Sequence, residues 1–438
     1  MLKKVSCMLL VMAMLLSLGA CKSSKEDTSS IVYLESEVVI GSDSKDNASN
    51  ASSKETSSRT KIEKVDDLSK IPSNLKGTTI TVYSWNAATD VSGASNVIKK
   101  FQNQTGIKIK WSVGSYDNYK SEIAAMVAAK NSPDVIRLRG YEPGILSLLD
   151  PVSVSGYEFK ENTWDKFVEG VYTIKGKVYG VNRKNTLLQQ PLVMFYNKDL
   201  MTKYDLGDPY ALWKQNKKNW NWEKFFDLCN AYKKAAGPDS KPWMTNGYKD
   251  YAWTFGSNIL KRNGDAIASN MNDSNLLIGY QKFAQLRMDG IAFTGWDMNG
   301  FNTDNYLFFG PSIISARRTH FDLKDMKSKG SLGVVPYPCV SGQSTYYQNV
   351  YETEAYGIPK GAKNAAAVPY FLNYYLNGDN YDKNTFFNDK KILDVYNYCM
   401  NETTLVSEYD RWILDVDSDR KNYAKFASQL STATPEQV

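Results

Sequence analysis

The alternation of apolar and polar positions is most informative near the middle of the chain. Residues 191–200 (PLVMFYNKDL) begin with an apolar run that is too short for a buried helix, so they predict a buried strand. The run stops at Asn197, a residue type that often caps a new helix. Strand and helix signals form one set before this strand and another after it. The pattern therefore predicts a crossover between two lobes, where hinges of closing proteins commonly lie.

The first of these sets alternates strands and helices. A strand pattern that ends at Trp85 is followed by a helical face with a glycine stop at Gly106, and the alternation then repeats. A run of this kind predicts a parallel sheet with right-handed crossovers. The predicted strands cover residues 78–85, 107–113 and 133–138, and the predicted helices cover 95–106 and 119–131.

Ligands of open parallel sheets bind beyond the carboxyl ends of the strands. Topology alone therefore selects the polar and aromatic residues that directly follow the three predicted strands. These first-lobe candidates for ligand binding are Trp85, Tyr116, Asp117, Arg139 and Tyr141.

The amino terminus has the pattern of a secretory leader. Lys3 and Lys4 precede an apolar stretch at 5–18 that is too short for a permanent membrane span, and small residues follow. Residues 18–21 (LGAC) resemble the lipobox of bacterial lipoproteins, which implies a signal peptide at 1–20 and a diacylglyceryl anchor on Cys21. A plain secretory peptide cut near Ala20 is the alternative.

The next segment is polar and precedes the folded part, which we expect to start near Gly77. Residues 22–60 are mostly Ser, Thr, Asn and charged residues, a composition that cannot offset chain entropy by burying apolar surface. We predict a disordered tether over residues 21–76. The apolar island at 31–40 is either solvated linker, a short strand or a docking peptide.

Composition excludes several classes of function. A chain of 438 residues exceeds what one core usually supports, so two domains are expected. The net charge of +6 is mild and the charges are interleaved, which argues against nucleic acid binding. His320 is the only histidine and no glycine-rich phosphate loop occurs, so we expect no cofactor and no metal. Three cysteines of the folded part, which we interpret as packing residues without choosing a disulfide pair, are Cys229, Cys339 and Cys399.

Seven stretches after Gly77 form a characteristic series in this order: FQNQTGIKIKW (101–111), SPDVIRL (132–138), GKVYGV (176–181), FYNKDL (195–200), NWNWEKFFDL (219–228), LGVVPYP (332–338) and EAYGIPKGAKNAAAVPYFLNYYL (354–376). Together they resemble the extracellular solute-binding proteins of ABC importers, in the large family that includes the maltose-binding proteins. The resemblance covers nearly all of the chain after Gly77.

The resemblance implies a two-lobed α/β periplasmic-binding-protein-like fold with hinge crossovers and a ligand cleft between the lobes. Lobe 1 would comprise residues 77–195 and 350–395, and lobe 2 residues 196–349 and 396–438. The chain departs from the family at Gly310-Pro311, before an expected strand SIISA (312–316). Residues 434–437 open like a helix, so a terminal helix of lobe 2 is suspected to be missing.

The resemblance also implies a function and partners. A monomeric protein on the outer face of the cell membrane would hold a small solute, preferably a mono- or oligosaccharide, and deliver it to ABC permease subunits. Sugars need aromatic rings for their C–H faces and polar groups for their hydroxyls, and aromatic residues form 13% of the chain. The candidates outside the first-lobe loops are Trp253, Arg318, Tyr356 and Trp412, with Arg317 and His320 beside Arg318.

Two other classes of function agree with parts of the sequence. A secreted hydrolase acting on carbohydrates needs only two carboxylates, for which Glu352 with Glu354, or Asp117 with Glu142, are the imaginable pairs. A surface adhesion lipoprotein fits the anchor and the tether but does not explain the order of the two lobes. We expect a binding protein and not an enzyme.

Overall fold

The computed structural model of the 438-residue chain describes most residues after the predicted leader and tether. The described residues are 62, 64–91, 93–116, 118–139, 145–245, 247, 249–257, 260–263, 266–317, 323, 326, 329–350, 353–383, 387, 389–406 and 434–435. The predicted signal peptide, Cys21, the predicted tether up to residue 61 and most of the carboxyl-terminal stretch lie outside them.

The first sheet has the strand order β2-β1-β3-β15-β4. Strand β1 runs parallel to both β2 and β3, and the helices α2 and α3 supply the two crossovers, so the predicted βαβαβ unit is confirmed. Strand β15, which comes from much later in the chain, pairs antiparallel with β3 and with β4. The bounds are β1 Thr79–Ser84, α2 Ala94–Thr105, β2 Lys108–Val113, α3 Tyr119–Ala128, β3 Val135–Arg139, β4 Leu149–Asp150 and β15 Glu354–Pro359.

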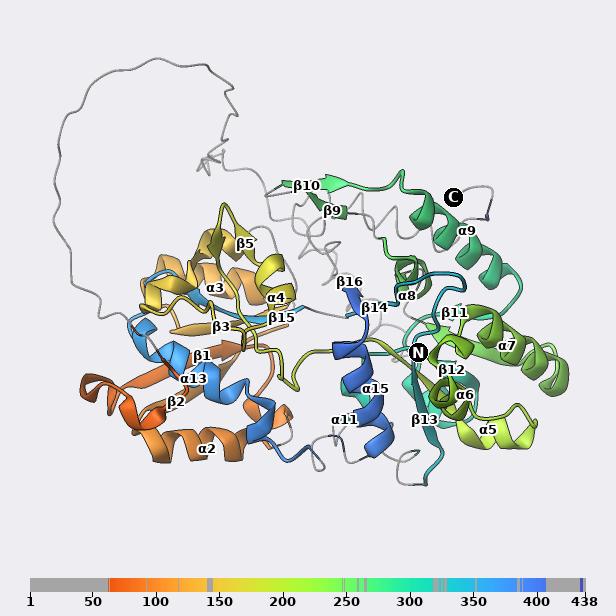
Figure 1. Cartoon of the computed structure of the whole chain (residues 1–438), viewed down its shortest axis with the longest axis horizontal. Coiled ribbons are helices and arrows are strands. Elements are labelled where there is room, and N and C mark those ends of the chain that lie inside the picture. The colour runs from red at the N-terminus through yellow and green to blue at the C-terminus, as the bar shows by residue number, and fades with distance from the viewer. Residues whose placement is uncertain are drawn as a thin grey trace, which may run out of the picture. The chain divides into compact units, whose positions relative to one another are not determined.

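Helices cover both faces of this sheet (Figure 1). Val135 packs in the core shared with α2 and with α13 (Val368–Tyr375), whereas the next residue, Ile136, packs with α3 and with α4 (Lys166–Val171). This alternation follows from the two-residue period of a strand. Helix α2 ends where Gly106 adopts a left-handed conformation, with φ of 72°, as its glycine stop predicted.

The second sheet has the order β11-β8-β12-β7-β13. Strands β8, β11 and β12 are mutually parallel, and β7 runs antiparallel to β12 and β13. Every residue of β7 is buried, and the Asn197 side chain accepts hydrogen bonds from the first turn of α5, so the predicted buried strand and helix cap are confirmed. The bounds are β7 Val193–Asn197, α5 Lys198–Lys203, β8 Lys241–Thr245, β11 Ala292–Thr294, β12 Tyr306–Phe309 and β13 Leu332–Pro336.

Two segments of the chain connect the two sheets side by side. Pro191, just before β7, pairs antiparallel with Val350, and the Leu192 N–H donates to the carbonyl oxygen of Asn349 over 2.9 Å. The outgoing segment enters β7 at the edge where the parallel strands of the second sheet end, and the returning segment enters β15 opposite Arg139, where β3 ends. The connecting segments therefore meet the carboxyl edges of both sheets.

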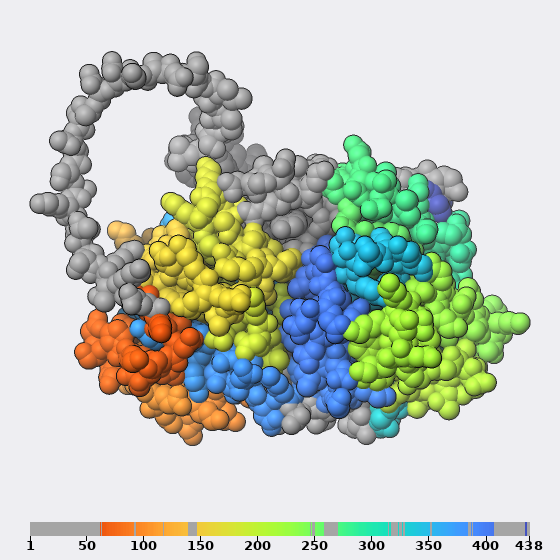
Figure 2. All heavy atoms as spheres, in the orientation of Figure 1, coloured from red at the N-terminus to blue at the C-terminus, as the bar shows by residue number. Residues whose placement is uncertain are grey.

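The remaining helices pack around these sheets. Helix α15 lies against α6 (Figure 2). The Tyr210 hydroxyl donates to Asp394 over 3.0 Å, and the Trp213 and Tyr398 rings are 5.2 Å apart. The bounds are α6 Pro209–Gln215, α7 Trp222–Ala236, α8 Lys249–Ala252, α9 Ser274–Met288, α10 Met298–Asn302, α11 Ile314–Arg317 and α15 Lys390–Asn401. The short strands are β5 Thr173–Ile174, β6 Lys177–Val178, β9 Leu260–Asn263, β10 Ala266–Ser269, β14 Tyr347–Asn349 and β16 Thr404–Val406.

The structure differs from two expectations. Residue 62 and residues 64–76 belong to the folded part and not to a disordered tether, because Val65, Ile71 and Leu75 are buried in the core of the first lobe. The expected strand SIISA is also wrong: Ser312 forms one bridge with Leu192, and the chain then turns into α11. The buried strand of this region is β12, which ends before Gly310.

The pairing of strands within each sheet shows where the chain passes between the two sheets. These points can be compared with the predicted lobe limits after residues 195, 349 and 395. All of β7 pairs within the second sheet, and α15 contacts β13 of that sheet. The crossings observed in the backbone therefore fall just before Val193 and just after Val350, and a further passage precedes Lys390.

Candidate functional site

The carboxyl edge of the first sheet carries a cluster of aromatic rings. Trp85 directly follows β1 and is only 8% exposed. Its ring meets Tyr119 edge-on at 5.1 Å and Tyr116 edge-on at 6.3 Å. The Arg137 guanidinium lies 4.5 Å from the centre of the Trp85 ring. Trp85 is thus largely enclosed, and Tyr116 is the more exposed ring, at 41% exposure.

A buried ion pair lies under this cluster. The Arg137 Nε donates to Glu354 over 2.8 Å, and a second guanidinium nitrogen pairs with the other carboxylate oxygen. The two side chains are 5% and 0% exposed. Gln190, in the outgoing connecting segment, also donates to the Glu354 carboxylate. A buried carboxylate with three donors is neutralised and held in place, so Glu354 ties β3 and β15 to the segment between the sheets.

The carboxyl edge of the second sheet contains buried polar groups. Thr245, the last residue of β8, donates to the Asp250 carboxylate over 2.5 Å, and Asp250 is 0% exposed. The Tyr337 hydroxyl donates to the carbonyl oxygen of Gly310 over 3.0 Å. Burial, and then the nearby Asp250, raise the pKa of Tyr337 well above its usual value.

The glycine of the Gly310-Pro311 pair, at which the chain departs from the family through Pro311, has a steric reason. A Cβ built on Gly310 would collide with the Tyr337 hydroxyl. The Gly310 backbone and the Tyr337 side chain approach closely because glycine has no Cβ atom that would separate them.

Two further aromatic residues predicted for the site, Trp253 and Tyr356, are buried. Trp253 is 1% exposed and belongs to the hydrophobic core, and Tyr356 is 1% exposed and packs edge-on against Tyr375 at 6.0 Å. Arg139 ends β3 opposite Glu354 in the backbone register. The other predicted site residues, Asp117, Tyr141, Arg318 and Trp412, lie outside the described residues.

The sequence analysis did not select Trp296, which lies at the carboxyl edge of the second sheet. Trp296 follows β11 by two positions and is 51% exposed. The rule that selected Trp85, namely that candidates follow parallel strands, would have selected Trp296 if the short strand β11 had been recognised.

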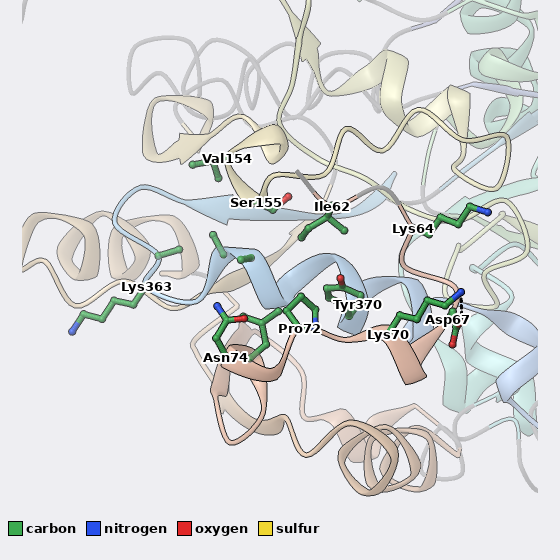
Figure 3. Close-up of a pocket in the computed structure, with 14 residues that line it drawn as sticks. Ile62, Lys64, Asp67, Lys70, Pro72, Asn74, Val154, Ser155, Lys363 and Tyr370 are labelled. Atoms are coloured by element: carbon green, nitrogen blue, oxygen red, sulfur yellow. Dashed lines mark ion pairs between the residues drawn. The ribbon is translucent and has the colours of Figure 1, made fainter. Parts of the chain in front are cut away.

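A pocket of about 810 Å³ lies elsewhere in the first lobe (Figure 3). Leu75, which precedes β1, and η8 (Ala365–Ala367), which follows β15, both line it, so it lies at the amino edge of the sheet. Figure 3 shows Ile62 and Tyr370 facing the same space. The pocket contains none of the predicted ligand-binding residues.

The described part of the chain holds no group of three or more His, Cys, Asp or Glu side chains that could bind a metal ion. Cys229, Cys339 and Cys399 are all unpaired thiols, which answers the question that the sequence left open. None of the described helices is long and apolar enough to cross a membrane.

The model of the family described as "Bacterial extracellular solute-binding protein" matches residues 96–386. The chain belongs to this family of extracellular solute-binding proteins. No curated protein sequence matches the chain.

Solved structures share the fold of this solute-binding protein. The GacH receptor of Streptomyces glaucescens, solved unliganded and with acarbose, superposes with a TM-score of 0.60 at 15% identity, covering 82% of this chain and 95% of that one. An ABC substrate-binding protein from Listeria monocytogenes in complex with cycloalternan gives 0.58 at 17% identity, covering 82% and 95%. The MalE domain of Bdellovibrio bacteriovorus bound to maltotriose gives 0.56 at 16% identity, covering 82% and 96%.

These matches confirm the two-domain α/β fold predicted from the sequence, and the family is one of extracellular solute-binding proteins, not of enzymes. The hydrolase alternative therefore fails. Glu354, one of the imagined catalytic acids, is instead the buried partner of Arg137.

Proposed function

We propose that this protein captures a carbohydrate outside the cell and delivers it to the permease of an ABC transporter. The observation that carries the proposal is that two adjacent connecting segments meet both sheets at their carboxyl edges, where ligands of such sheets bind. Aromatic rings and polar groups gather at these edges, as sugar recognition requires. Neighbours of the same fold were solved with acarbose, cycloalternan and maltotriose.

The mechanism is closure of two lobes on the ligand. Contacts supplied by both lobes exist together only in the closed form, so the ligand favours closure by its differential affinity for the two forms. Gln190 lies between the two sheets, so its hydrogen bonds should change when the lobes close. Its side chain donates to Glu354 of the first sheet and accepts from the Ser312 hydroxyl, beside the second sheet, over 3.4 Å. Binding is noncovalent.

The site residues of the proposal combine both edges. Tyr116 is the proposed exposed contact of the first lobe, beside Trp85. The sequence-based assignments of Asp117, Arg139 and Tyr141, and of Arg318 and Trp412 in the later part of the chain, stand as further proposals.

The membrane anchor belongs to the same proposal. A diacylglyceryl group on Cys21 would supply the two lipid chains that stable attachment needs, and the polar segment after it would hold the monomeric domain off the membrane. Cys21→Ala should release the protein from the membrane fraction into the medium. Retention of that variant in the membrane would overturn the anchor without affecting the binding proposal.

The decisive experiment is a thermal-shift screen of the purified folded domain against sugars of one to four units, with peptides, polyamines and inorganic anions as the comparison set. A bound sugar at about 100 times its Kd should add about 2.7 kcal/mol to the free energy of unfolding. Chromatography should recover that sugar intact. A shift with a peptide, polyamine or anion and none with any sugar would overturn the carbohydrate proposal.

Tyr116→Ala supplies the matched test of the site. Its side chain is partly exposed, so its removal should weaken sugar binding about tenfold with little effect on folding. Calorimetric titration measures the affinity. An unchanged Kd would remove Tyr116 from the site.

A further inference from the structure

Trp296 is the one tryptophan among six large apolar residues that are exposed in the described part of the chain. An indole ring has a large apolar surface, and exposing half of it to water is unfavourable unless a ligand or partner covers it when the protein functions. Single exposed apolar residues are common on proteins, so the support and the position of this ring decide its meaning.

The loop that carries Trp296 is fixed on both sides. The Gly295 N–H donates to the carbonyl oxygen of Thr245 over 2.9 Å, which ties the loop to the end of β8. On the other side, the Asp297 carboxylate accepts from the Gly300 N–H over 2.7 Å and caps α10. The indole itself rests on the fully buried Phe309 ring, at 5.3 Å and 69°. The ring is therefore a supported platform that needs little ordering when a ligand binds.

The position of the ring sets the length of ligand that could use it. Trp296 follows β11, an edge strand, whereas the connecting segment enters the sheet at β7, three strands away in the order β11-β8-β12-β7. Three strand spacings amount to about 14 Å. One sugar ring is shorter than this distance.

We propose that Trp296 forms an outer subsite that stacks on a sugar ring of an oligosaccharide whose other end lies near the connecting segments. The inference rests on the proposed carbohydrate function and names its substrate class, a chain of sugars rather than a monosaccharide. Two exposed polar residues flank Trp296 in the sequence, Thr294 before it and Asn299 in the first turn of α10. Their side chains can form hydrogen bonds with the hydroxyl groups of the stacked sugar unit.

The test uses a ladder of one to four units of the sugar that gives the largest thermal shift, with Kd measured by calorimetry. The wild type should bind the longer members more tightly than the monosaccharide. Trp296→Ala should weaken the tri- and tetrasaccharide about tenfold and leave the shortest bound member within about twofold. Trp296→Phe, which keeps an aromatic face, should restore most of the lost affinity.

Met288→Ala is the matched control, because Met288 is 60% exposed and ends α9 at the opposite, amino edge of β11. It should bind every member like the wild type. Equal affinity of wild type and Trp296→Ala for the longest sugar would overturn the subsite while leaving the carbohydrate function intact, as would a wild type that prefers the monosaccharide. A protein that binds no sugar at all would overturn both.

Discussion

The carboxyl edges of the two sheets each carry buried charged groups and a tryptophan, but the two tryptophans differ in burial. At the first edge the tryptophan, Trp85, is enclosed by Arg137 and two tyrosines, and a tyrosine is exposed. At the second edge the tryptophan of the outer strand, Trp296, is half exposed, and the charged group, Asp250, is buried. Position at a strand end thus selects candidates, but packing decides which of them can touch a ligand.

The largest expected effect tests the rigidity of the first edge. Glu354→Ala leaves the Arg137 guanidinium buried without its partner, so the free energy of unfolding should fall by about 3–5 kcal/mol in urea denaturation. The double variant Arg137→Met, Glu354→Leu should recover much of this loss, because it removes both charges.

An exposed pair supplies the control for that experiment. Glu169→Ala breaks the ion pair between Glu169 and Lys166, in which the Lys166 side chain is 50% exposed and the Glu169 side chain 26% exposed. This change should alter the free energy of unfolding by about 0–1 kcal/mol. Similar losses in the two single variants would mean that burial of the Arg137–Glu354 pair has no special weight.

The second prediction compares Trp253, which the sequence analysis selected for the site, with Trp296, which it missed. Trp253→Ala removes a fully buried ring and should lower the free energy of unfolding by about 3–5 kcal/mol. Trp296→Ala removes a half-exposed ring and should lower it by about 1 kcal/mol or less. Equal losses in thermal or urea unfolding would contradict the contrast between a core residue and a surface platform.

The smallest expected effect compares one glycine at each edge. A Cβ on Gly310 would meet the hydroxyl of the buried Tyr337, and a Cβ on Gly114, directly after β2, would meet the hydroxyl of the partly exposed Tyr83. The buried ring cannot move aside, so Gly310→Ala should destabilise by about 1–3 kcal/mol and Gly114→Ala by less.

Rescue identifies the collision as the cause. Tyr337→Phe removes the hydroxyl, so Gly310→Ala should be tolerated better in that background than in the wild type, as a double-mutant cycle measures. Additive losses would show that the glycine serves another purpose.

Local patterns in the sequence determined the elements of this protein. The period of apolar residues predicted β1, β2 and β3 with their two helices, and the short apolar run with Asn197 predicted β7 and its helix cap, because these features depend on residues close together in the chain. The same local rule misassigned residues 312–316 and missed β11, where strands are too short to show a period.

Only the tertiary structure decided which residues meet and which remain exposed. Arg137 and Glu354 are 217 positions apart, and no spacing rule links residues across such a separation. Trp253 and Trp296 have the same side chain, yet one is enclosed by the core and the other rests on Phe309 in solvent. Burial depends on the packing of all neighbouring elements at once, so the sequence by itself indicated the edges at which a ligand would bind, and the folded chain selected the side chains that can reach it.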